Sequence, residues 1–448
     1  MIEVLVVVGP GVVADAGLLE EIAAREFSAA GVSGTLVHAR DASQVLSLLS
    51  SPSSPSSPEG AGGVVVLPGP SAEVRSLIGR DLGAVVWVDV ERVDGVTAGE
   101  GATHLHGRGV GGLAWGIRHA VHRVRHPSRR IAYGPLPEQW GELYLPDADE
   151  PPVAMLIHGG YWRSIWAADI MGPLCADLVG RGLAVWNLEY RRPDLHGWDA
   201  TTADVAAGLS ALATAHAAPH GSDALPPDLL PSGALPAGVD RTVGLDLTRV
   251  TVVGHSAGAQ LALRAVADAV AGEASATGGA QAAAGEAYAA GGALEAIGAH
   301  AVDRARADAG ACTAGEARAV GGVRVVMVVS LAGVLDLVEG DRRWVGTGAV
   351  GAALGGRAPE GQVAVPPYAD ASPLLRLPLG VRQLVVQGAA DDLDLVDFSR
   401  RYARAAEEAG DEVTYLEMPG DHFDVINPAT PIWQAAARAL AGGPASRG

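Results

Sequence analysis

The chain contains no lysine, so all 32 of its basic side chains are arginines, and they are outnumbered by 51 acidic side chains. The resulting net charge at pH 7 is −19. A field of that sign repels phosphate backbones and anionic membrane surfaces. We therefore expect this protein to bind neither nucleic acid nor a membrane.

Cysteines and long apolar runs are scarce as well. With Cys175 and Cys312 alone, the 448 residues have no disulfide framework, which suits a reducing compartment. The apolar run at residues 4–8 lacks the length and the basic flank of a signal peptide. The longest later run, around residues 325–334, is far shorter than the roughly 20 residues that cross a bilayer. We expect a cytoplasmic protein.

The chain does contain two series of short apolar runs that alternate with helical stretches, as buried parallel strands do in three-layer α/β proteins. The first series ends with a helix at about residues 112–124, and a linker follows at 127–130. We predict two α/β domains, at residues 1–126 and 127–448. Their strands are expected at residues 4–8, 64–67 and 84–88, and then at 153–157, 183–188, 250–253, 323–331, 384–386 and 413–416.

Three segments are too poor in large apolar side chains to form packed elements. Residues 50–63 are mainly Ser, Pro and Gly, and residues 215–238 are rich in Pro and Ala. Residues from about 268 to 322 are mostly Ala, Gly and acidic residues. We interpret the first two segments as surface loops and the third as a low-complexity insertion in the second domain.

The most informative motif is Gly254-His-Ser256-Ala-Gly258, between an apolar strand and a helix-forming run. Its two glycines let the backbone turn sharply and hold the serine hydroxyl above the sheet edge, as in the nucleophile elbow of α/β-hydrolases. A loop without a chemical role is the alternative for so short a motif. The strand before it and the helix after it favour Ser256 as a catalytic nucleophile.

A serine nucleophile needs a base, and the base needs an acid that sets its tautomer. His422 lies on the loop after the last predicted strand, and Asp391 lies just after the predicted strand at residues 384–386. The chain order Ser, Asp, His is that of the α/β-hydrolases. We assign the catalytic roles to Ser256, Asp391 and His422, and keep Asp392 and Asp394 as alternatives for the acid.

Backbone donors for a charged transition state are expected in the loop after the strand at residues 153–157. That loop reads His158-Gly-Gly-Tyr-Trp162. A glycine turn with two aromatic core residues is the alternative interpretation. We assign an oxyanion hole to the N–H groups of Gly159, Gly160, Tyr161 and Ala257, and expect Tyr161 and Trp162 to bind substrate.

The helix at residues 112–124 carries His119, His122 and, just beyond it, His126, a spacing that could suit a metal ion. Helical geometry places these histidines opposite the apolar face and among three arginines, whose charges repel a cation. We therefore expect a solvated helix face there, and neither a metal nor a cofactor in the protein.

The motifs of the second domain resemble those of kynurenine formamidases (arylformamidases) and related carboxylesterases of the α/β-hydrolase superfamily. The resemblance covers about residues 133–441 and includes Tyr161-Trp162, where lipase-like relatives carry a third glycine. Segments around Glu189-Tyr-Arg191 and residues 331–336 also fit, whereas the insertion at 268–322 departs from that group. The resemblance implies an α/β-hydrolase fold and hydrolysis of a small ester or aryl formamide.

The first domain resembles type II 3-dehydroquinate dehydratase, a flavodoxin-like α/β enzyme, at residues 7–11, 65–69 and 86–90. The resemblance implies a flavodoxin-like three-layer fold for residues 1–126. Gly11 and Leu67 stand where that family has asparagines, its histidine position near Asp89 holds another residue, and no tyrosine precedes Tyr133. We expect a degenerate domain without dehydratase activity, whose remaining role is packing or assembly of a homo-oligomer.

The sequence thus predicts a serine hydrolase for a small ester or aryl formamide. Two other interpretations stay open, a non-catalytic scaffold that keeps both folds and a lipase or peptidase on the same fold. The joint presence of the serine, the acid, the histidine and the glycine turn argues against the scaffold. We also expect the second domain to keep its activity when residues 1–126 are removed.

Overall fold

The computed structural model describes residues 2–50, 62–217, 244–277, 318–320, 322–360 and 365–441. Most of the three predicted low-complexity segments lie outside these described residues, and so does Cys312. Among the described helices, none combines the length and the apolar character needed to cross a membrane.

The chain forms two compact units whose boundaries differ from the predicted domains. The first unit contains the described residues of Met1–Arg129 and also Ser164–Ala176. The second unit contains Arg130–Arg163, Asp177–Ala217 and the described residues of Gly244–Gly448. The prediction placed one boundary between residues 126 and 127, because composition marks a linker but does not show where a distant segment packs.

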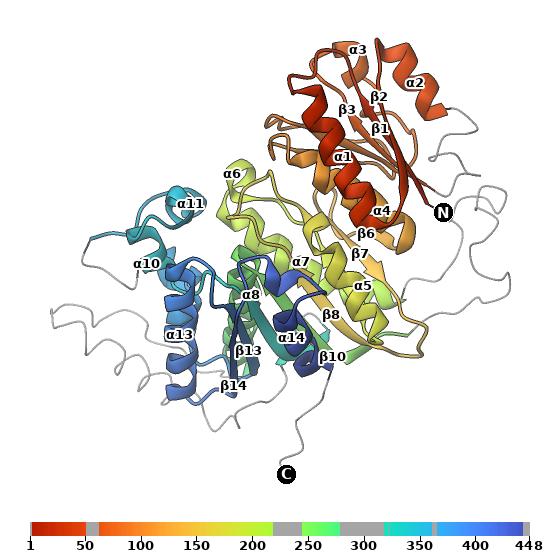
Figure 1. Cartoon of the computed structure of the whole chain (residues 1–448). Helices are drawn as coiled ribbons and strands as arrows, with labels where there is room; N and C mark the ends of the chain where they lie inside the picture. Colours follow the sequence, from red (N-terminus) through yellow and green to blue (C-terminus); the bar gives the residue numbers. More distant parts are fainter. Residues whose placement is uncertain are drawn as a thin grey trace. The chain divides into compact units, whose positions relative to one another are not determined.

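The first unit is built on a five-stranded parallel sheet with the order β2-β1-β3-β4-β5. This is the flavodoxin-like doubly wound order, so the predicted fold class is confirmed for this unit. The strands are β1 (Glu3–Val8), β2 (Ser33–His38), β3 (Gly62–Leu67), β4 (Val85–Asp89) and β5 (Thr103–His106). The helices are α1 (Ala16–Ala30), α2 (Ala42–Ser50), α3 (Ala72–Arg75) and α4 (Gly112–Arg125), as Figure 1 shows.

Both faces of this sheet are covered, because successive residues of a strand point to opposite sides. Val6 belongs to a buried cluster with side chains of α1 and α4. Its neighbour Val7 belongs to a second cluster with side chains of α2 and α3. The strands are therefore apolar on both faces, which is why they were recognisable as continuous apolar runs.

The histidine-bearing face of α4 is not solvated, contrary to the prediction. His119 is 6% exposed, and its Nε2 lies 3.3 Å from the hydroxyl of Thr103. His122 is packed against Gly172, where an added Cβ would lie 3.1 Å from the imidazole ring. The prediction failed because helical periodicity does not reveal that the segment Ser164–Ala176 belongs to this unit and contacts the helix.

The second unit contains a mixed sheet with the order β14-β13-β12-β10-β8-β9-β7-β6, and β11 pairs with β12. Neighbouring strands are parallel from β14 to β9, and β7 is antiparallel to β9. A central strand leads into the serine elbow, so the predicted α/β-hydrolase fold is confirmed. The strands are β6 (Arg129–Ala132), β7 (Trp140–Tyr144), β8 (Pro152–Ile157), β9 (Ala184–Leu188), β10 (Asp246–His255), β11 (Arg318–Val320), β12 (Val323–Leu331), β13 (Arg382–Gly388) and β14 (Val413–Met418).

Helices connect these strands. Both ends of the insertion predicted at about residues 268–322 form regular elements, because α8 continues to Thr277 and Arg318–Val320 forms β11. The helices after α4 are η1 (Ala168–Met171), α5 (Gly172–Gly180), α6 (Pro193–His196), α7 (Trp198–Ala217), α8 (Ala257–Thr277), α10 (Leu337–Arg342), α11 (Val345–Leu354), α12 (Tyr368–Ala371), η3 (Pro373–Arg376), α13 (Leu393–Glu408), η4 (Asp424–Ile426) and α14 (Pro431–Ala441).

Candidate active site

Ser256 lies in the turn between β10 and α8. Its φ of 55° is in the left-handed region, which is strained for a residue other than glycine. The turn is so tight that a Cβ on Gly254 would lie 2.2 Å from the carbonyl oxygen of Gly258. A Cβ on Gly258 would lie 2.2 Å from the carbonyl oxygen of Ile157 at the end of β8. Both glycines of the motif are therefore required by packing.

His422 and Asp391 lie on the loops after β14 and β13, two neighbouring parallel strands. The Nδ1 atom of His422 is 2.9 Å from Oδ2 of Asp391 and 3.2 Å from its Oδ1. A carboxylate accepts hydrogen bonds, so Nδ1 carries the proton and Nε2 is left as the basic nitrogen.

The acids considered from the sequence have different surroundings. The side chain of Asp391 is 3% exposed and also accepts hydrogen bonds from the Gln387 amide at 2.9 Å and from the Asp392 N–H at 2.7 Å. The carboxylate of Asp392 instead caps α13 by accepting the N–H of Asp394 at 2.9 Å. The structure therefore brings Asp391 to His422 and gives Asp392 a helix-capping position.

The charge on Asp391 is stabilised by its partners. Burial raises the pKa of this carboxyl group, but hydrogen bonds and the charge of His422 outweigh burial. The net pKa lies below its ordinary value. Asp391 is therefore ionised at neutral pH and can stabilise a positive charge on His422.

The turn after β8 has an unusual backbone and lies beside the elbow. Gly160, Tyr161 and Trp162 have positive φ values of 122°, 50° and 56°. A Cβ on Gly159 would lie 2.8 Å from the Cβ of Ser256. The turn can therefore approach the serine this closely only with glycine at position 159.

The predicted oxyanion donors are backbone N–H groups of this turn and of the elbow. Within the described ranges, none of the hydrogen bonds found outside helices and strands uses the N–H of Gly159, Gly160, Tyr161 or Ala257. These groups follow the strained turn and the nucleophile elbow directly. Their role as donors to a negative oxygen bound to Ser256 stays a prediction.

The two aromatic residues of the turn have different environments. Trp162 is 2% exposed, lies in the core and donates its Nε1–H to Gln260 at 3.1 Å. Tyr161 is half-buried, and burial, followed by the charges of Asp392 and Asp391, raises the pKa of its hydroxyl. Tyr161 therefore lies near the acid-bearing loop, whereas Trp162 is a core residue and is not kept as a substrate contact.

A buried polar network that was not predicted holds the turn. The Nε2 atom of His158 lies 3.4 Å from Oε1 of Glu189. Tyr190 stacks on the His158 ring with the centroids 4.4 Å apart and donates its hydroxyl to the His158 carbonyl oxygen at 2.8 Å. Glu189 is in turn paired with Arg192. The Glu189-Tyr-Arg191 motif was the sequence signal for this network, but a motif does not reveal which residue it contacts.

His255 was also missed as a site residue. It is the last residue of β10, is 1% exposed, and its Nε2 lies 3.0 Å from the carbonyl oxygen of His422. The two imidazole rings are 4.8 Å apart. Its position beside Ser256 was the available sequence signal, and that signal does not show the contact with a loop 167 residues away.

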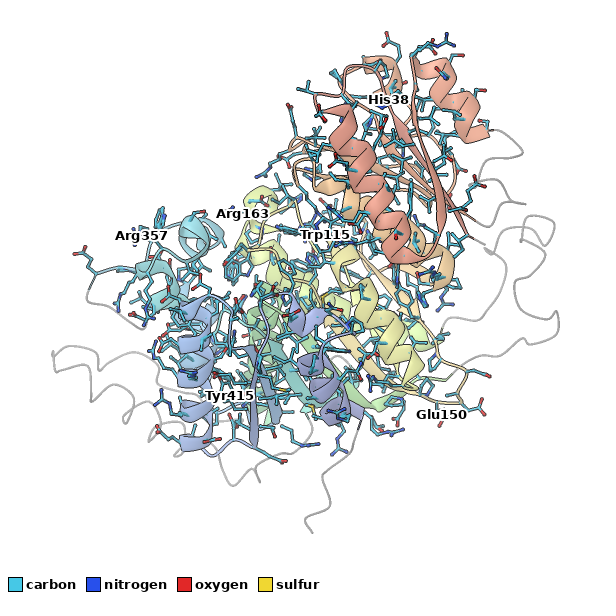
Figure 2. All side chains as sticks on the ribbon, viewed as in Figure 1. His38, Trp115, Glu150, Arg163, Arg357 and Tyr415 are labelled. Atoms are coloured by element: carbon cyan, nitrogen blue, oxygen red, sulfur yellow. The ribbon has the colours of Figure 1, made fainter. Side chains whose placement is uncertain are left out.

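A loop at residues 344–348 packs on Tyr161. A Cβ on Gly346 would lie 2.5 Å from the Tyr161 ring, and Gly346, Thr347 and Gly348 all have positive φ. Arg163, labelled in Figure 2, donates to the Gly346 carbonyl oxygen at 3.1 Å and to the Thr347 hydroxyl at 3.3 Å. The loop is therefore held against the turn that contains the predicted oxyanion donors.

Exposed apolar side chains accompany the site loops. Leu393 follows the acid-bearing turn, and Phe423 follows His422, with its ring centroid 5.5 Å from the His422 ring. Arg343, next to Trp344, forms an ion pair at 2.9 Å with Asp394, which lies in the first turn of α13. The side chain of Trp344 is 54% exposed, that of Leu393 is 80% exposed and that of Phe423 is 43% exposed.

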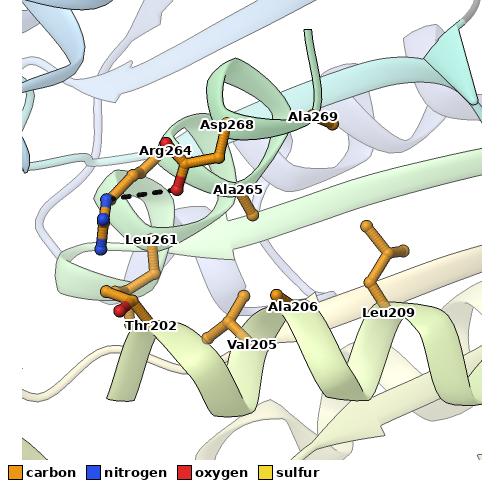
Figure 3. Close-up of a pocket in the computed structure, with 9 residues that line it drawn as sticks. All are labelled: Thr202, Val205, Ala206, Leu209, Leu261, Arg264, Ala265, Asp268 and Ala269. Carbon is orange, nitrogen blue, oxygen red and sulfur yellow. Dashed lines mark ion pairs between the residues drawn. The ribbon is translucent and has the colours of Figure 1, made fainter. Parts of the chain in front are cut away.

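A cavity of about 230 Å³ lies elsewhere in the second unit, between α7 and α8 (Figure 3). An ion pair between Arg264 and Asp268, 3.4 Å long, lies in its otherwise mainly apolar wall. The predicted site residues do not line this cavity. In the part of the chain that the structure describes, no group of three or more His, Cys, Asp or Glu side chains is arranged to hold a metal ion.

No protein-family model matches the chain, and no curated protein is a significant match. Similar solved structures include esterase 2 of Thermogutta terrifontis phosphoramylated by tabun, at 15% identity and a TM-score of 0.43, over 70% of this chain and 91% of that one. Phosphonate-inhibited esterase B from Lactobacillus rhamnosis aligns at 16% identity and a TM-score of 0.45, over 70% of this chain and 85% of that one.

A bifunctional GH43-CE protein of Bacteroides eggerthii is also similar, at 18% identity and a TM-score of 0.46, over 70% of this chain. This chain spans about a third of that protein, 35% of its length. Because these identities and TM-scores are low, we base the fold assignment on the strand order and the function on the site of this chain.

Proposed function

We propose that this protein is a serine hydrolase and that its catalytic triad is Ser256, His422 and Asp391. The main support is the 2.9 Å pairing of His422 with Asp391 on loops of the sheet whose central strand ends in the strained Ser256 turn. A histidine and an acid paired for stability alone would not require a strained serine nearby. The combination therefore favours a hydrolase over a scaffold.

In the proposed reaction, the Ser256 hydroxyl oxygen attacks the substrate carbonyl carbon while Nε2 of His422 takes its proton. The Asp391 carboxylate stabilises the imidazolium and does not itself become protonated. The N–H groups of Gly159, Gly160, Tyr161 and Ala257 bind the negative oxygen of the tetrahedral intermediate. His422 then protonates the leaving group, and water hydrolyses the acyl-serine by the same steps.

For the substrate, we infer a small carboxylic ester or an aryl formamide, as the resemblance to kynurenine formamidases implies. The half-buried ring of Tyr161 and the exposed rings of Trp344 and Phe423 suit a flat aromatic group. Comparison of kcat/KM for N-formylkynurenine and for short p-nitrophenyl esters tests this inference. A much lower value for N-formylkynurenine would make the protein a plain esterase.

We propose no catalytic role for the first unit. The dehydratase-like positions Gly11 and Leu67 lack the amide side chains of that chemistry. Asp89 is paired with Arg75 at 2.8 Å and with His104 at 2.8 Å, which accounts for its charge without a substrate. Dehydration of 3-dehydroquinate above the rate of a heat-killed control would contradict this proposal.

The central test of the hydrolase proposal is Ser256→Ala. Because triad residues act as a unit, we expect hydrolysis of p-nitrophenyl acetate to fall by roughly 10⁴-fold or more, and labelling by a fluorophosphonate probe to disappear. The variant should remain folded by circular dichroism. Unchanged labelling would show that another residue is the nucleophile.

A further inference from the structure

One buried side chain contacts two of the loops that form the candidate active site and immediately precedes the third, the turn that carries Ser256. His255 immediately precedes Ser256 at the elbow. Its Nε2 lies 3.0 Å from the carbonyl oxygen of His422. On the other side of the ring, a Cβ on Gly159 would lie 3.0 Å from Nδ1 of His255, so the oxyanion turn packs directly against this ring.

The hydrogen bond identifies the tautomer of His255. A carbonyl oxygen only accepts hydrogen bonds, so Nε2 of His255 must carry the proton and donate it. Nδ1 is buried and has no hydrogen-bond partner among the described residues. Burial, followed by the nearby His422, lowers the pKa of His255 to about 3. His255 is therefore a neutral donor throughout the pH range in which a serine hydrolase works.

We infer that His255 is a positioning residue that fixes the main chain of His422, so that the His422 imidazole stays between Asp391 and the serine. This inference rests on the proposed hydrolase function. Asp391 holds the side chain of His422 through Nδ1, and His255 holds its backbone through the carbonyl oxygen. Two anchors at different atoms restrict both the loop and the ring, which one hydrogen bond alone does not do.

The neutrality of His255 is a necessary part of this role. Its ring centroid is 4.8 Å from that of His422. A positive charge at that distance would repel the positive charge that forms on His422 when it takes the serine proton, and would therefore disfavour this proton transfer. A buried neutral imidazole supplies the donor without that repulsion. A lysine or arginine could not supply it in the same way.

The test compares two substitutions in the full-length protein. His255→Gln keeps an N–H donor at about the reach of Nε2, whereas His255→Phe keeps the ring volume and removes the donor. We expect His255→Phe to lower kcat for p-nitrophenyl acetate by up to about 10²-fold, with a much smaller change in KM. His255→Gln should retain most of the activity. His38→Phe, at an exposed histidine labelled in Figure 2, is the matched control.

A second measurement does not depend on turnover. The Nδ1–H proton shared by His422 and Asp391 should give a downfield proton NMR signal, which His255→Phe should shift or broaden and His255→Gln should preserve. Wild-type kcat and an unchanged signal in His255→Phe would overturn the inference, and so would equal losses in both variants. If the wild-type protein neither hydrolyses esters nor reacts with fluorophosphonate, the proposed function fails, while a signal that responds as expected still supports the positioning role.

Discussion

At the scale of single residues, Asp391 and Asp392 are adjacent acids with opposite surroundings. We expect Asp391→Asn to lower kcat by on the order of 10³ to 10⁴-fold, because an amide at this position no longer favours the productive tautomer of His422. Asp392→Asn should leave kcat within a few-fold of wild type. Asparagine caps helices about as well as aspartate, so α13 should also keep its stability.

Ester hydrolysis and thermal unfolding of the two variants together check this prediction. Both substitutions remove one negative charge, so each serves as the charge control for the other. Inactivity of Asp392→Asn with activity in Asp391→Asn would identify Asp392 as the acid. Equal and large losses in both variants would indicate that the local charge, not the hydrogen bond to His422, is what matters.

The half-buried His122 predicts a pH dependence of stability. Burial, followed by the charges of His126 and Arg123, lowers the pKa of His122 to about 3, from an ordinary 6.5. Between these values the unfolded chain binds a proton that the folded chain does not, so stability decreases as the pH falls through this window. From pH 6.5 to 5 this amounts to at most about 2 kcal/mol. His122→Gln should therefore lose less thermal stability than wild type between pH 7.5 and 5.

The control for that experiment is His38→Gln, at an exposed histidine of the same unit. It should show the same pH-dependent loss as the wild-type protein. If the thermal stability of His122→Gln depends on pH as that of the wild type does, the His122 imidazole accepts a proton in the folded protein without destabilising it.

How far a residue could be predicted depended on whether its role follows from chain order. Ser256 and His422 were selected from the elbow motif and from the order of strands and loops. Asp391 was favoured among three acids after one strand, but Asp392 and Asp394 stayed open as alternatives, because the direction of each side chain depends on the start of α13. Tyr161 and Trp162 looked equivalent for a similar reason, since the positive φ values of their turn decide which ring enters the core.

At the scale of elements, the elbow depends on two close backbone contacts. We expect Gly254→Ala and Gly258→Ala each to prevent fluorophosphonate labelling and to lower thermal stability strongly, because each new Cβ would lie 2.2 Å from a carbonyl oxygen. Gly180→Ala, at the end of α5, is the control. Nothing lies within 4 Å of a Cβ there, so it should be close to neutral. Normal labelling of either elbow variant would mean that the turn adapts.

Most of the strands that the sequence predicted are central ones, although β14, which was also predicted, lies at an edge of the second sheet. Buried parallel strands such as β1 and β10 have apolar residues on both faces and appear as continuous runs. The missed strands β2 and β5 form the two edges of the first sheet, and β6 and β7 lie at one edge of the second. Edge strands such as β2, whose residues are half-buried or exposed, lack that run and resemble loops in the sequence.

At the scale of the whole molecule, the division into units is not sequential. Ser164–Ala176 belongs to the first unit, although the residues before and after it in the chain belong to the second. Removal of residues 1–126 would therefore take away the partners of this segment. We now expect a chain shortened in this way to be unstable, and not an independent hydrolase as the sequence suggested. Assembly of a homo-oligomer through residues 1–126 stays a prediction.

One partner of the segment Ser164–Ala176 in the first unit is Arg108. Its guanidinium makes two hydrogen bonds to the carboxylate of Asp169, at 2.6 and 2.7 Å, and a third to the Ile165 carbonyl oxygen at 2.7 Å. Both charged side chains are 2% exposed. The guanidinium also lies 4.7 Å from the ring centroid of Trp166. The buried charge of Arg108 is tolerated because the Asp169 carboxylate pairs with it through two parallel hydrogen bonds, a bidentate geometry.

Replacement of Arg108 tests whether this pair holds the segment in the first unit. Arg108→Ala leaves the Asp169 carboxylate buried without its cation, and we expect the free energy of unfolding to fall by about 3 to 5 kcal/mol. Arg108→Lys should recover little, because an ammonium group cannot make both parallel hydrogen bonds. Arg80→Ala, at an exposed arginine of the same unit, should change stability little. Urea unfolding of the three variants gives the comparison, and equal stability of Arg108→Ala and Arg80→Ala would show that the segment is held by its apolar contacts instead.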